Sequence, residues 1–340
     1  MNTPVITPFG NMPDGQEVTS ITIAGGGLTA TFLTYGAVLQ DLRLQGHSSS
    51  LVLGLNSLND YLNHSRYFGA TAGRYANRIA NGHVKINGAS YQLDTNFIGK
   101  HLLHGGQAGI GKKVWRITKY SSHSVELAID SPDGDMGFPG NLAIEATFSL
   151  LAGGTLDIVY RATTDATTLC NLAHHSYFNL GNSNDVLDHE LQVNAHSYLP
   201  VDAELIPTGQ KQPVADTLFD YRCAHALRNK VMDTAYDHNF CLSDNKTTLR
   251  PVAQLSSADS AITMQVLTTE PGLQVYDGGG LNVPVPGLDL RPIGAYGGIA
   301  MEPQVWPNSP NNEHFPQAFL HPFECYEQHT QFKFNKEKKL

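Results

Sequence analysis

Short stretches of alternating apolar and polar residues, separated by glycine-rich turns, recur along this chain of 340 residues and limit its fold more than any other feature. Residues 18–23 and 28–32 alternate on either side of Gly25-Gly26-Gly27, and residues 84–86 and 91–93 flank Asn87-Gly88. A period of two marks a half-buried strand, and an Asn-Gly step between two such runs is a strong hairpin signal. These segments therefore predict antiparallel hairpins.

The same signals continue to the C-terminus. Further strands are predicted at residues 42–44, 51–54, 125–129, 142–150, 156–162, 191–193, 240–242, 262–267, 273–276, 299–301 and 332–334. Only residues 56–63 and 223–229 suggest brief helices. Because strands do not alternate with long helices, the pattern disfavours a doubly wound α/β fold and favours an all-β fold, a large antiparallel β-sandwich. No linker or shift in composition divides the chain, so we expect one domain over residues 1–340.

Composition narrows the classes of partner. With 41% hydrophobic and 16% charged residues the chain is globular, and its net charge of -9 argues against nucleic acid or an anionic membrane, which both attract concentrated Lys and Arg. No apolar run reaches the ~18 residues of a membrane span. We therefore expect no nucleic-acid or membrane partner and a cytoplasmic location. Reduced thiols fit the four widely spaced cysteines, Cys170, Cys223, Cys241 and Cys325.

The segment from Asn171 to Leu180 is the first candidate for chemistry, because it holds His174 and His175 beside two aromatic residues. Imidazole has an ordinary pKa near neutrality and exchanges protons at pH 7 with little tuning. A hydrogen-bonded packing role is the alternative for either histidine. Neighbours on a strand point to opposite faces, so the two rings do not share one site.

Four further polar positions occur where predicted strands meet glycine-rich or turn segments, a place where side chains converge on ligands. Each has an alternative structural role. Arg78, next to Asn77, is suited to anchor ligand oxygens or to pair with a core carboxylate. Asp237 either accepts from ligand hydroxyls or holds a turn. The other two are His104, which precedes Gly105-Gly106, and Gln274.

A metal site has little support in the sequence. His101 and His104 form an HxxH pair, but a metal needs three or four ligands, and no further thiolate or carboxylate follows at a fitting spacing. We therefore expect no metal.

Glu302 ends an apolar strand and is a candidate general base. Apart from Tyr296 it is the only readily ionisable side chain between Arg291 and Glu313. Partial burial raises the pKa of a glutamate toward the range useful for a base. The alternative is a structural ion pair with Arg78 or Arg74.

Taken in order, these motifs resemble the aldose 1-epimerase (galactose mutarotase) family over nearly the whole chain. The resemblance rests on seven stretches: residues 73–80, 103–106, 133–135 with 137–140, 175–180, 199–202 with 206–209, 237–240 and 302–304. It implies a single supersandwich domain with an open sugar cleft, without metal or cofactor. The implied function is interconversion of α and β anomers of free aldohexoses such as galactose and glucose.

Carried over by position, the resemblance makes His175 the general acid and Glu302 the general base, on opposite sides of the sugar ring. His104 would hold the reacting end of the sugar. The remaining implied contacts bind hydroxyls or orient the catalytic pair, and they are Asn77, Arg78, Asp237 and Gln274.

Three positions depart from the family pattern. His174 stands where asparagine is common, Asn308 replaces an aspartate, and Phe323 replaces a glycine. By strand alternation His174 faces away from His175, unless the backbone bends and brings it into the cleft.

Two other functions are compatible with the sequence. A hexose-6-phosphate 1-epimerase would need a cationic cluster, which this acidic sequence does not reveal, and a non-catalytic sugar-binding protein could dispense with the acid or the base. Both His175 and Glu302 are present, which favours an enzyme acting on a small aldose. The sequence leaves the preferred aldose open, and either a monomer or a homodimer is compatible with it.

Overall fold

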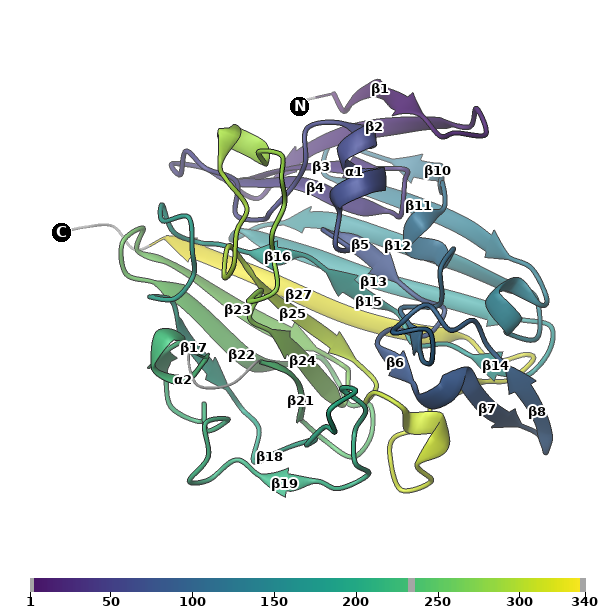
Figure 1. Cartoon of the computed structure of the whole chain (residues 1–340). Coiled ribbons are helices and arrows are strands. Elements are labelled where there is room, and N and C mark those ends of the chain that lie inside the picture. The colour runs from purple at the N-terminus through teal and green to yellow at the C-terminus, as the bar shows by residue number, and fades with distance from the viewer. Residues whose placement is uncertain (1–2, 232–235, 337–340) are drawn as a thin grey trace.

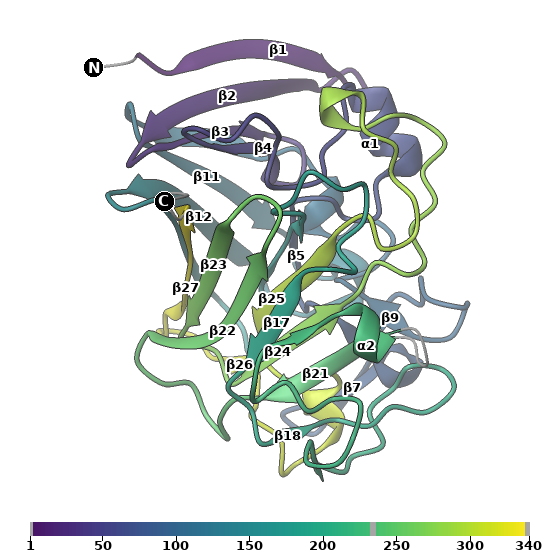
Figure 2. The ribbon, with the colours of Figure 1, turned by 90° about the vertical axis from the view of Figure 1, so that its left-hand side faces the viewer.

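Antiparallel strands dominate the computed structural model, which describes residues 3–231 and 236–336 (Figure 1 and Figure 2). Within these residues the largest sheet has the order β10 (Arg116–Tyr120), β11 (Ser124–Ser131), β12 (Leu142–Leu151), β13 (Thr155–Thr164), β27 (Tyr326–Lys336), β23 (Ile262–Thr268), β22 (Arg250–Ser257), β17 (Glu190–Val193) and β20 (His225–Ala226). A second sheet has the order β16 (Tyr177–Phe178), β25 (Ile299–Gln304), β24 (Gly272–Tyr276), β21 (Asp237–Cys241), β18 (Ser197–Tyr198) and β19 (Gln212–Pro213). A third sheet joins β1 (Val5–Asn11), β2 (Glu17–Gly25), β3 (Leu28–Leu33) and β4 (Val38–Leu44).

Four short two-stranded ladders lie outside these three sheets in the described residues. They pair β5 (Ala70–Ala72) with β15 (Ala173–His175), β6 (Arg78–Ile79) with β9 (Leu102–Leu103), β7 (His83–Ile86) with β8 (Ala89–Gln92), and β14 (Thr168–Leu169) with β26 (Phe319–Leu320). The described helices are α1 (Leu58–His64) and α2 (Arg228–Val231), with single 3₁₀ turns at η1 (Ala80–Gly82), η2 (Ile110–Lys112), η3 (Asp135–Gly137), η4 (Leu288–Leu290) and η5 (Ser309–Asn311). The prediction of an antiparallel β-sandwich with few short helices is confirmed.

Strand β12 illustrates how the sequence pattern becomes a sheet. Its residues alternate between buried and more exposed positions, with Leu142, Ile144 and Phe148 buried. Because successive side chains point to opposite faces, this alternation gives the strand one apolar face toward the core. All ten residues pair with β13, across the predicted turn at Gly153-Gly154.

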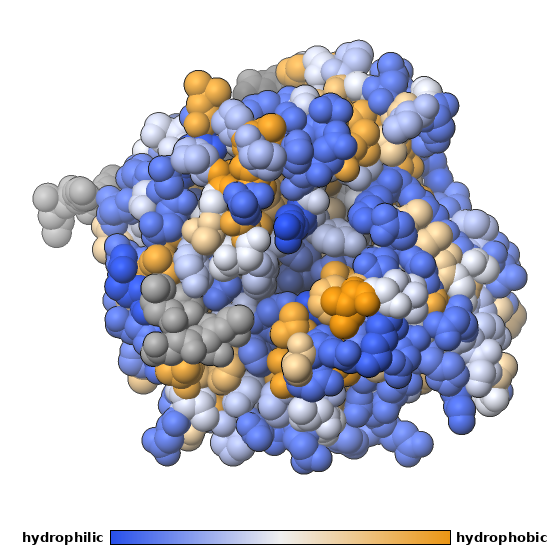
Figure 3. Space-filling view, viewed as in Figure 1, coloured by the Kyte–Doolittle hydropathy of each residue, from blue (hydrophilic) through white to orange (hydrophobic). Residues whose placement is uncertain are grey.

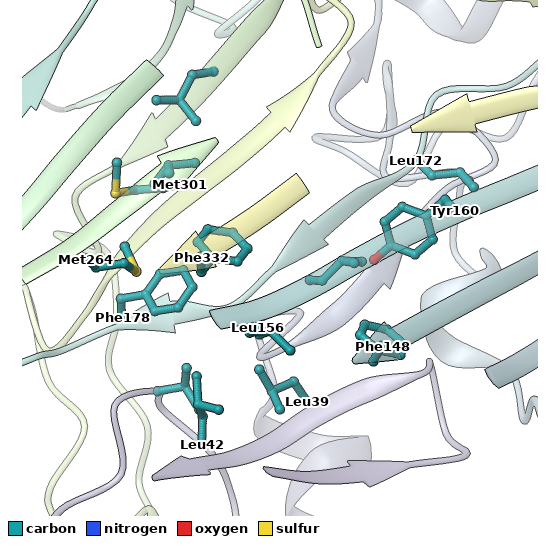
Figure 4. Packing of buried hydrophobic residues seen from close by; sticks show 14 of the residues in the cluster. Leu39, Leu42, Phe148, Leu156, Tyr160, Leu172, Phe178, Met264, Met301 and Phe332 are labelled. Carbon is teal, nitrogen blue, oxygen red and sulfur yellow. The ribbon is translucent and has the colours of Figure 1, made fainter. Parts of the chain in front are cut away.

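The main core lies between the large sheet and the other two. Phe332 on β27 packs against Phe178 with ring centroids 4.8 Å apart, and Phe148 on β12 packs against Phe32 at 4.6 Å. Each such buried side chain stabilises the fold by ~1.5–3 kcal/mol. Figure 4 shows side chains of this core packed between strands of all three sheets. The labelled residues are Leu39, Leu42, Phe148, Leu156, Tyr160, Leu172, Phe178, Met264, Met301 and Phe332.

Two local predictions were wrong and one was confirmed. Residues 51–54 are buried but form a single bridge, Val52 to Phe178, instead of a strand. Residues 223–229 contain β20, and helix α2 begins only at Arg228. The predicted helix at 56–63 is α1, and Ser57 caps it by accepting a hydrogen bond from the Asp60 amide at 3.1 Å.

The two C-terminal departures from the family pattern have simple local consequences. Asn308 lies in the left-handed region at φ 57, which asparagine tolerates, and its side-chain oxygen accepts from the Ala80 amide at 3.0 Å. Phe323 is fully exposed at φ 70, a conformation that favours the glycine usual at this position. No helix of the described residues is long and apolar enough to cross a membrane.

Candidate active site

A cleft of about 730 Å³ opens where the small ladders meet the sheet of β24 and β25. Figure 3 shows this face of the molecule hollowed near its centre. Six of the seven site residues expected from the sequence line the cleft: Asn77, Arg78, His104, His175, Asp237 and Glu302. They come from β6 and the residue before it, β15, β21, β25 and the turn after β9, so the fold brings together segments more than two hundred residues apart.

Strand β15 separates the two neighbouring histidines. His175 faces the cleft, where its ring lies 5.1 Å from that of Tyr177. His174 faces the core, between Phe148 and Phe332, and its Nε2 lies within hydrogen-bonding distance of the Ser176 hydroxyl at 2.8 Å. The expectation that His174 points away from the cleft is confirmed.

The side chains of His175 and Glu302 meet at the floor of the cleft. His175 Nε2 lies 3.5 Å from Glu302 Oε1, and the side chains are only 5% and 2% exposed. The two groups are therefore adjacent in the cleft. Among the described residues no hydrogen-bond partner reaches the buried Glu302 Oε2.

Burial shifts both of these groups away from their charged forms. Desolvation lowers the pKa of His175 to about 4. Desolvation also raises the pKa of Glu302 well above its ordinary value, and the nearby Asp237 carboxylate raises it further. Between these limits the pair holds one titratable proton, which these shifts place on Glu302, next to His175 Nε2 as its acceptor.

Arg78 and Asp237 form one wall of the cleft. Arg78 Nη2 lies 2.8 Å from Asp237 Oδ2, and the Arg78 guanidinium lies over the Phe97 ring at 4.6 Å. Burial opposes ionisation of Asp237, but the charge and hydrogen bond of Arg78 and the amide of Gln274 bring its pKa below the ordinary value. Both partners line the cleft, so the ion pair and a ligand contact are compatible.

Gln274 does not line the cleft with the other six residues. Its Nε2 donates to Asp237 Oδ1 at 2.6 Å, and the side chain is 2% exposed. On β24 it stands in register between Asn239 on β21 and Glu302 on β25. Gln274 therefore orients Asp237 through a hydrogen bond made outside the lining of the cleft.

His104 closes the other wall. Its ring centroid lies 5.1 Å from that of His175 and 4.6 Å from that of Tyr67. Burial lowers the pKa of His104 well below its ordinary value, and the nearby His175, Arg78 and Lys112 act in the same direction. The ring is therefore neutral at pH 7.

The HxxH pair does not form a shared site. Nδ1 of His101 accepts from the Asn81 amide at 2.9 Å and Nε2 lies 3.1 Å from Glu204 Oε2. His104 instead stands with His175 and Glu302, whose potential ligand atoms all lie within 4.8 Å of one another, the one such group in the described part of the chain. Whether this group suits a metal depends on which ring nitrogen of His104 carries the proton.

Sequence reasoning missed most of the aromatic and rim residues of the cleft. Tyr67, at φ 61 in the loop before β5, gave no local signal, although its ring centroid lies 5.9 Å from that of His175. Asp277 receives hydrogen bonds from the Gly279 and Tyr236 amides, and burial raises its pKa to about 6. The missed lining residues are Arg66, Tyr67, Phe97, Leu103, Tyr177, Leu205, Tyr276, Asp277, Gly279, Gly280 and Tyr296.

Comparison with known proteins shows the family of the chain. The family model for aldose 1-epimerase matches residues 19–333. The chain is 39% identical to galactose mutarotase of Mus musculus, over 97% of this chain and 98% of the relative. It is 36% identical to aldose 1-epimerase of Escherichia coli, over 95% and 96% of the two chains.

Solved structures agree with these relatives. An aldose epimerase homologue from C. elegans superposes with a TM-score of 0.88 at 31% identity, covering 93% of this chain and 98% of that one. A galactose 1-epimerase from Lactobacillus acidophilus superposes with a TM-score of 0.85 at 30% identity, covering 98% and 99%.

The fold and the cleft together define an antiparallel β-sandwich enzyme of the carbohydrate isomerase class. More specifically, the chain belongs to the aldose 1-epimerase family. This membership confirms the family resemblance, the isomerase class and the function that the sequence predicted, with a small sugar as the substrate.

Proposed function

We propose that this protein interconverts the α and β anomers of free aldohexoses such as galactose and glucose, with Glu302 as general base and His175 as general acid. The observation that supports it best is the 3.5 Å approach of these two side chains at the floor of a cleft. A pyranose carries O1 and O5 on the same carbon, C1. Two adjacent groups are therefore better placed to reach both oxygens than two groups on opposite faces of the ring.

The reaction needs the pair's one titratable proton on His175, so it starts after Glu302 has passed that proton to His175 Nε2, 3.5 Å away. Glu302 takes the proton of the C1 hydroxyl, C1 becomes an aldehyde carbon, the C1–O5 bond breaks, and His175 gives its proton to O5. Rotation about C1–C2 presents the other face of the aldehyde. The same steps then run in reverse, with His175 taking the proton from O5 and Glu302 returning one to O1.

The remaining residues supply orientation. Arg78 and Asp237 offer donors and acceptors to the sugar hydroxyls, and Gln274 holds Asp237 in place. Tyr67 and Tyr177 flank His175 and line the cleft, where an aromatic ring is suited to pack against the apolar side of a pyranose. The burial of the pair keeps bulk water from exchanging protons with it.

A sugar phosphate is a poor fit for the same cleft. The cations lining it in the described residues are Arg66 and Arg78, and Arg78 is already paired with Asp237. Two further carboxyl groups, those of Asp277 and Glu302, also line it. This balance of charge favours a neutral aldose, and we expect the chain to act as one cytoplasmic domain, as a monomer or a homodimer.

Polarimetry of freshly dissolved sugar tests the proposal. With α-D-galactose or α-D-glucose, the protein should speed the approach of optical rotation to equilibrium well beyond the rate in buffer alone. The ratio of the two kcat/KM values gives the preferred aldose. Rates equal to buffer for both sugars would contradict the proposal.

A further inference from the structure

Asn77 and His104 hold each other through two hydrogen bonds at the end of a short ladder. Arg78 on β6 pairs with Leu103 on β9, and the residues just outside this pair are Asn77 and His104. The His104 amide donates to the Asn77 carbonyl at 3.0 Å, and the Asn77 amide donates to Nδ1 of the His104 ring at 3.2 Å. The imidazole is thus fixed by the backbone that precedes Arg78.

The second of these bonds determines where the ring carries its proton. A ring nitrogen accepts from an N–H only if it is itself unprotonated, and a neutral imidazole has one protonated nitrogen. The ring of His104 is neutral, because it is buried near Arg78 and Lys112. With Nδ1 occupied as an acceptor, the proton lies on Nε2.

The conformation of Asn77 makes this arrangement possible. Asn77 has φ 64 and His104 has φ 48, and asparagine tolerates the left-handed region better than most residues. The side-chain oxygen of Asn77 accepts from the Arg78 amide at 2.9 Å. Both the main chain and the side chain of Asn77 are therefore engaged by neighbouring site residues.

We propose that the backbone amide of Asn77 fixes His104 in the Nε2–H tautomer, so that His104 donates a hydrogen bond to an oxygen at the reacting end of the sugar. Asn77 is then a positioning residue, which acts through His104 and Arg78. The part that concerns the sugar rests on the proposed function, whereas the tautomer itself is a property of the empty protein.

The same tautomer makes the cluster of His104, His175 and Glu302 a poor metal site. In a tetrahedral zinc site with bonds of ~2.0–2.1 Å, ligand atoms lie about 3.4 Å apart, so a cluster within 4.8 Å is close enough to be considered. However, Nδ1 of His104 is occupied by the Asn77 amide, and Nε2 carries the proton. If the proton moved to Nδ1, the Nδ1–H and the Asn77 N–H would point at each other with no acceptor between them. His104 therefore does not supply the third ligand that a metal would need.

Nitrogen NMR tests the tautomer without any sugar. Protein labelled with ¹⁵N-histidine is studied at about pH 7.5, and the His104 signals are assigned by their loss in His104→Gln. We expect a non-protonated shift for Nδ1 and a protonated shift for Nε2. An Nδ1–H tautomer, or averaged shifts from a mixture, would overturn the proposal even if the enzyme is fully active.

A matched pair of variants tests the donor. In His104→Gln the amide nitrogen reaches the position of Nε2 with a donor, and in His104→Glu an oxygen of similar reach only accepts. Loss of one preorganised donor costs ~10²–10³-fold in kcat, so the Glu variant should fall by that factor and the Gln variant should stay at least about tenfold faster. Circular dichroism checks that both fold. Equal rates, or a faster Glu variant, would contradict the donor role.

Calorimetric titration with zinc chloride tests the metal argument. We expect no zinc site that galactose displaces, whereas zinc on surface histidines would be insensitive to the sugar. A zinc site that galactose displaces and that His104→Gln abolishes would require a free Nε2 on His104. It would therefore overturn the assigned tautomer.

Discussion

Nε2 of His175 and Oε1 of Glu302 lie 3.5 Å apart at the floor of the cleft, although β15 and β25 are separated by more than a hundred residues of chain. Tyr177, next but one to His175, pairs with Ala300, next but one to Glu302. This short pairing of β16 with β25 brings the two ionisable groups together. The distance also makes them a coupled pair that titrates as a unit.

The pH dependence of kcat/KM should be bell-shaped. Below the pKa of His175, about 4, both groups carry protons and the base is lost. At high pH Glu302 ionises while His175 stays neutral, so no proton remains for the ring oxygen. Polarimetric rates from about pH 4 to about pH 10 should rise and then fall. A flat profile over this range would show that the pair does not control the reaction.

Glu302→Gln should stabilise the fold near neutral pH. The folded protein retains the Glu302 proton above the ordinary pKa of 4.5, where the unfolded chain releases it, so the native carboxyl costs stability as the pH rises above 4.5. An amide of the same shape avoids this cost. We expect a higher melting temperature than that of the wild type at about pH 7.5, and no gain at about pH 4. A gain of equal size at both values would point to packing instead of ionisation.

Asp237→Ala should weaken both stability and sugar binding. The change leaves the buried Arg78 guanidinium without its carboxylate, which typically costs ~3–5 kcal/mol. The isosteric Asp237→Asn keeps an acceptor for Gln274 and should cost less. Urea unfolding measures the stability, and polarimetry should show a raised KM for both variants. If both match the wild type, the ion pair supports neither the fold nor the sugar.

His174→Asn, which restores the residue common in the family, should leave the pH profile unchanged. Burial lowers the pKa of His174 to about 3, so its ring is neutral throughout the working range, and it faces the core away from His175. The smaller side chain leaves space beside Phe148 and Phe332 and should destabilise the fold by ~1–2 kcal/mol. Denaturation and pH–rate curves measured side by side check both statements, and a shifted curve would place His174 in the proton transfer.

The sequence predicted strands correctly where alternating apolar and polar residues flank a turn. Hairpins such as β2–β3 and β7–β8 follow from alternation around glycine turns. Strand β1 escaped notice because it is largely exposed, with a register shift between Pro8 and Gly10, and so shows no apolar face. Residues 51–54 are apolar because they are buried beside β16, without the pairing that would make them a strand.

In the active site, the types of residue were predictable from the sequence, but their positions relative to one another were not. An imidazole and a desolvated carboxylate suggest acid–base chemistry by type alone, but their adjacency depends on the pairing of distant strands. The position of Gln274 behind Asp237 depends on the register of β21 against β24. The hydrogen bond from Asn77 to His104 depends on two backbone torsions, which no pattern of side chains reveals.

The measurement that tests the central claim most directly is the polarimetric rate of α-D-galactose mutarotation by folded His175→Ala and Glu302→Gln. Each general acid or base typically contributes ~10²–10⁴-fold, so either variant should fall nearly to the rate of buffer alone while its circular dichroism stays native. Near-normal rates for either folded variant would contradict the assignment of His175 and Glu302 as the catalytic pair.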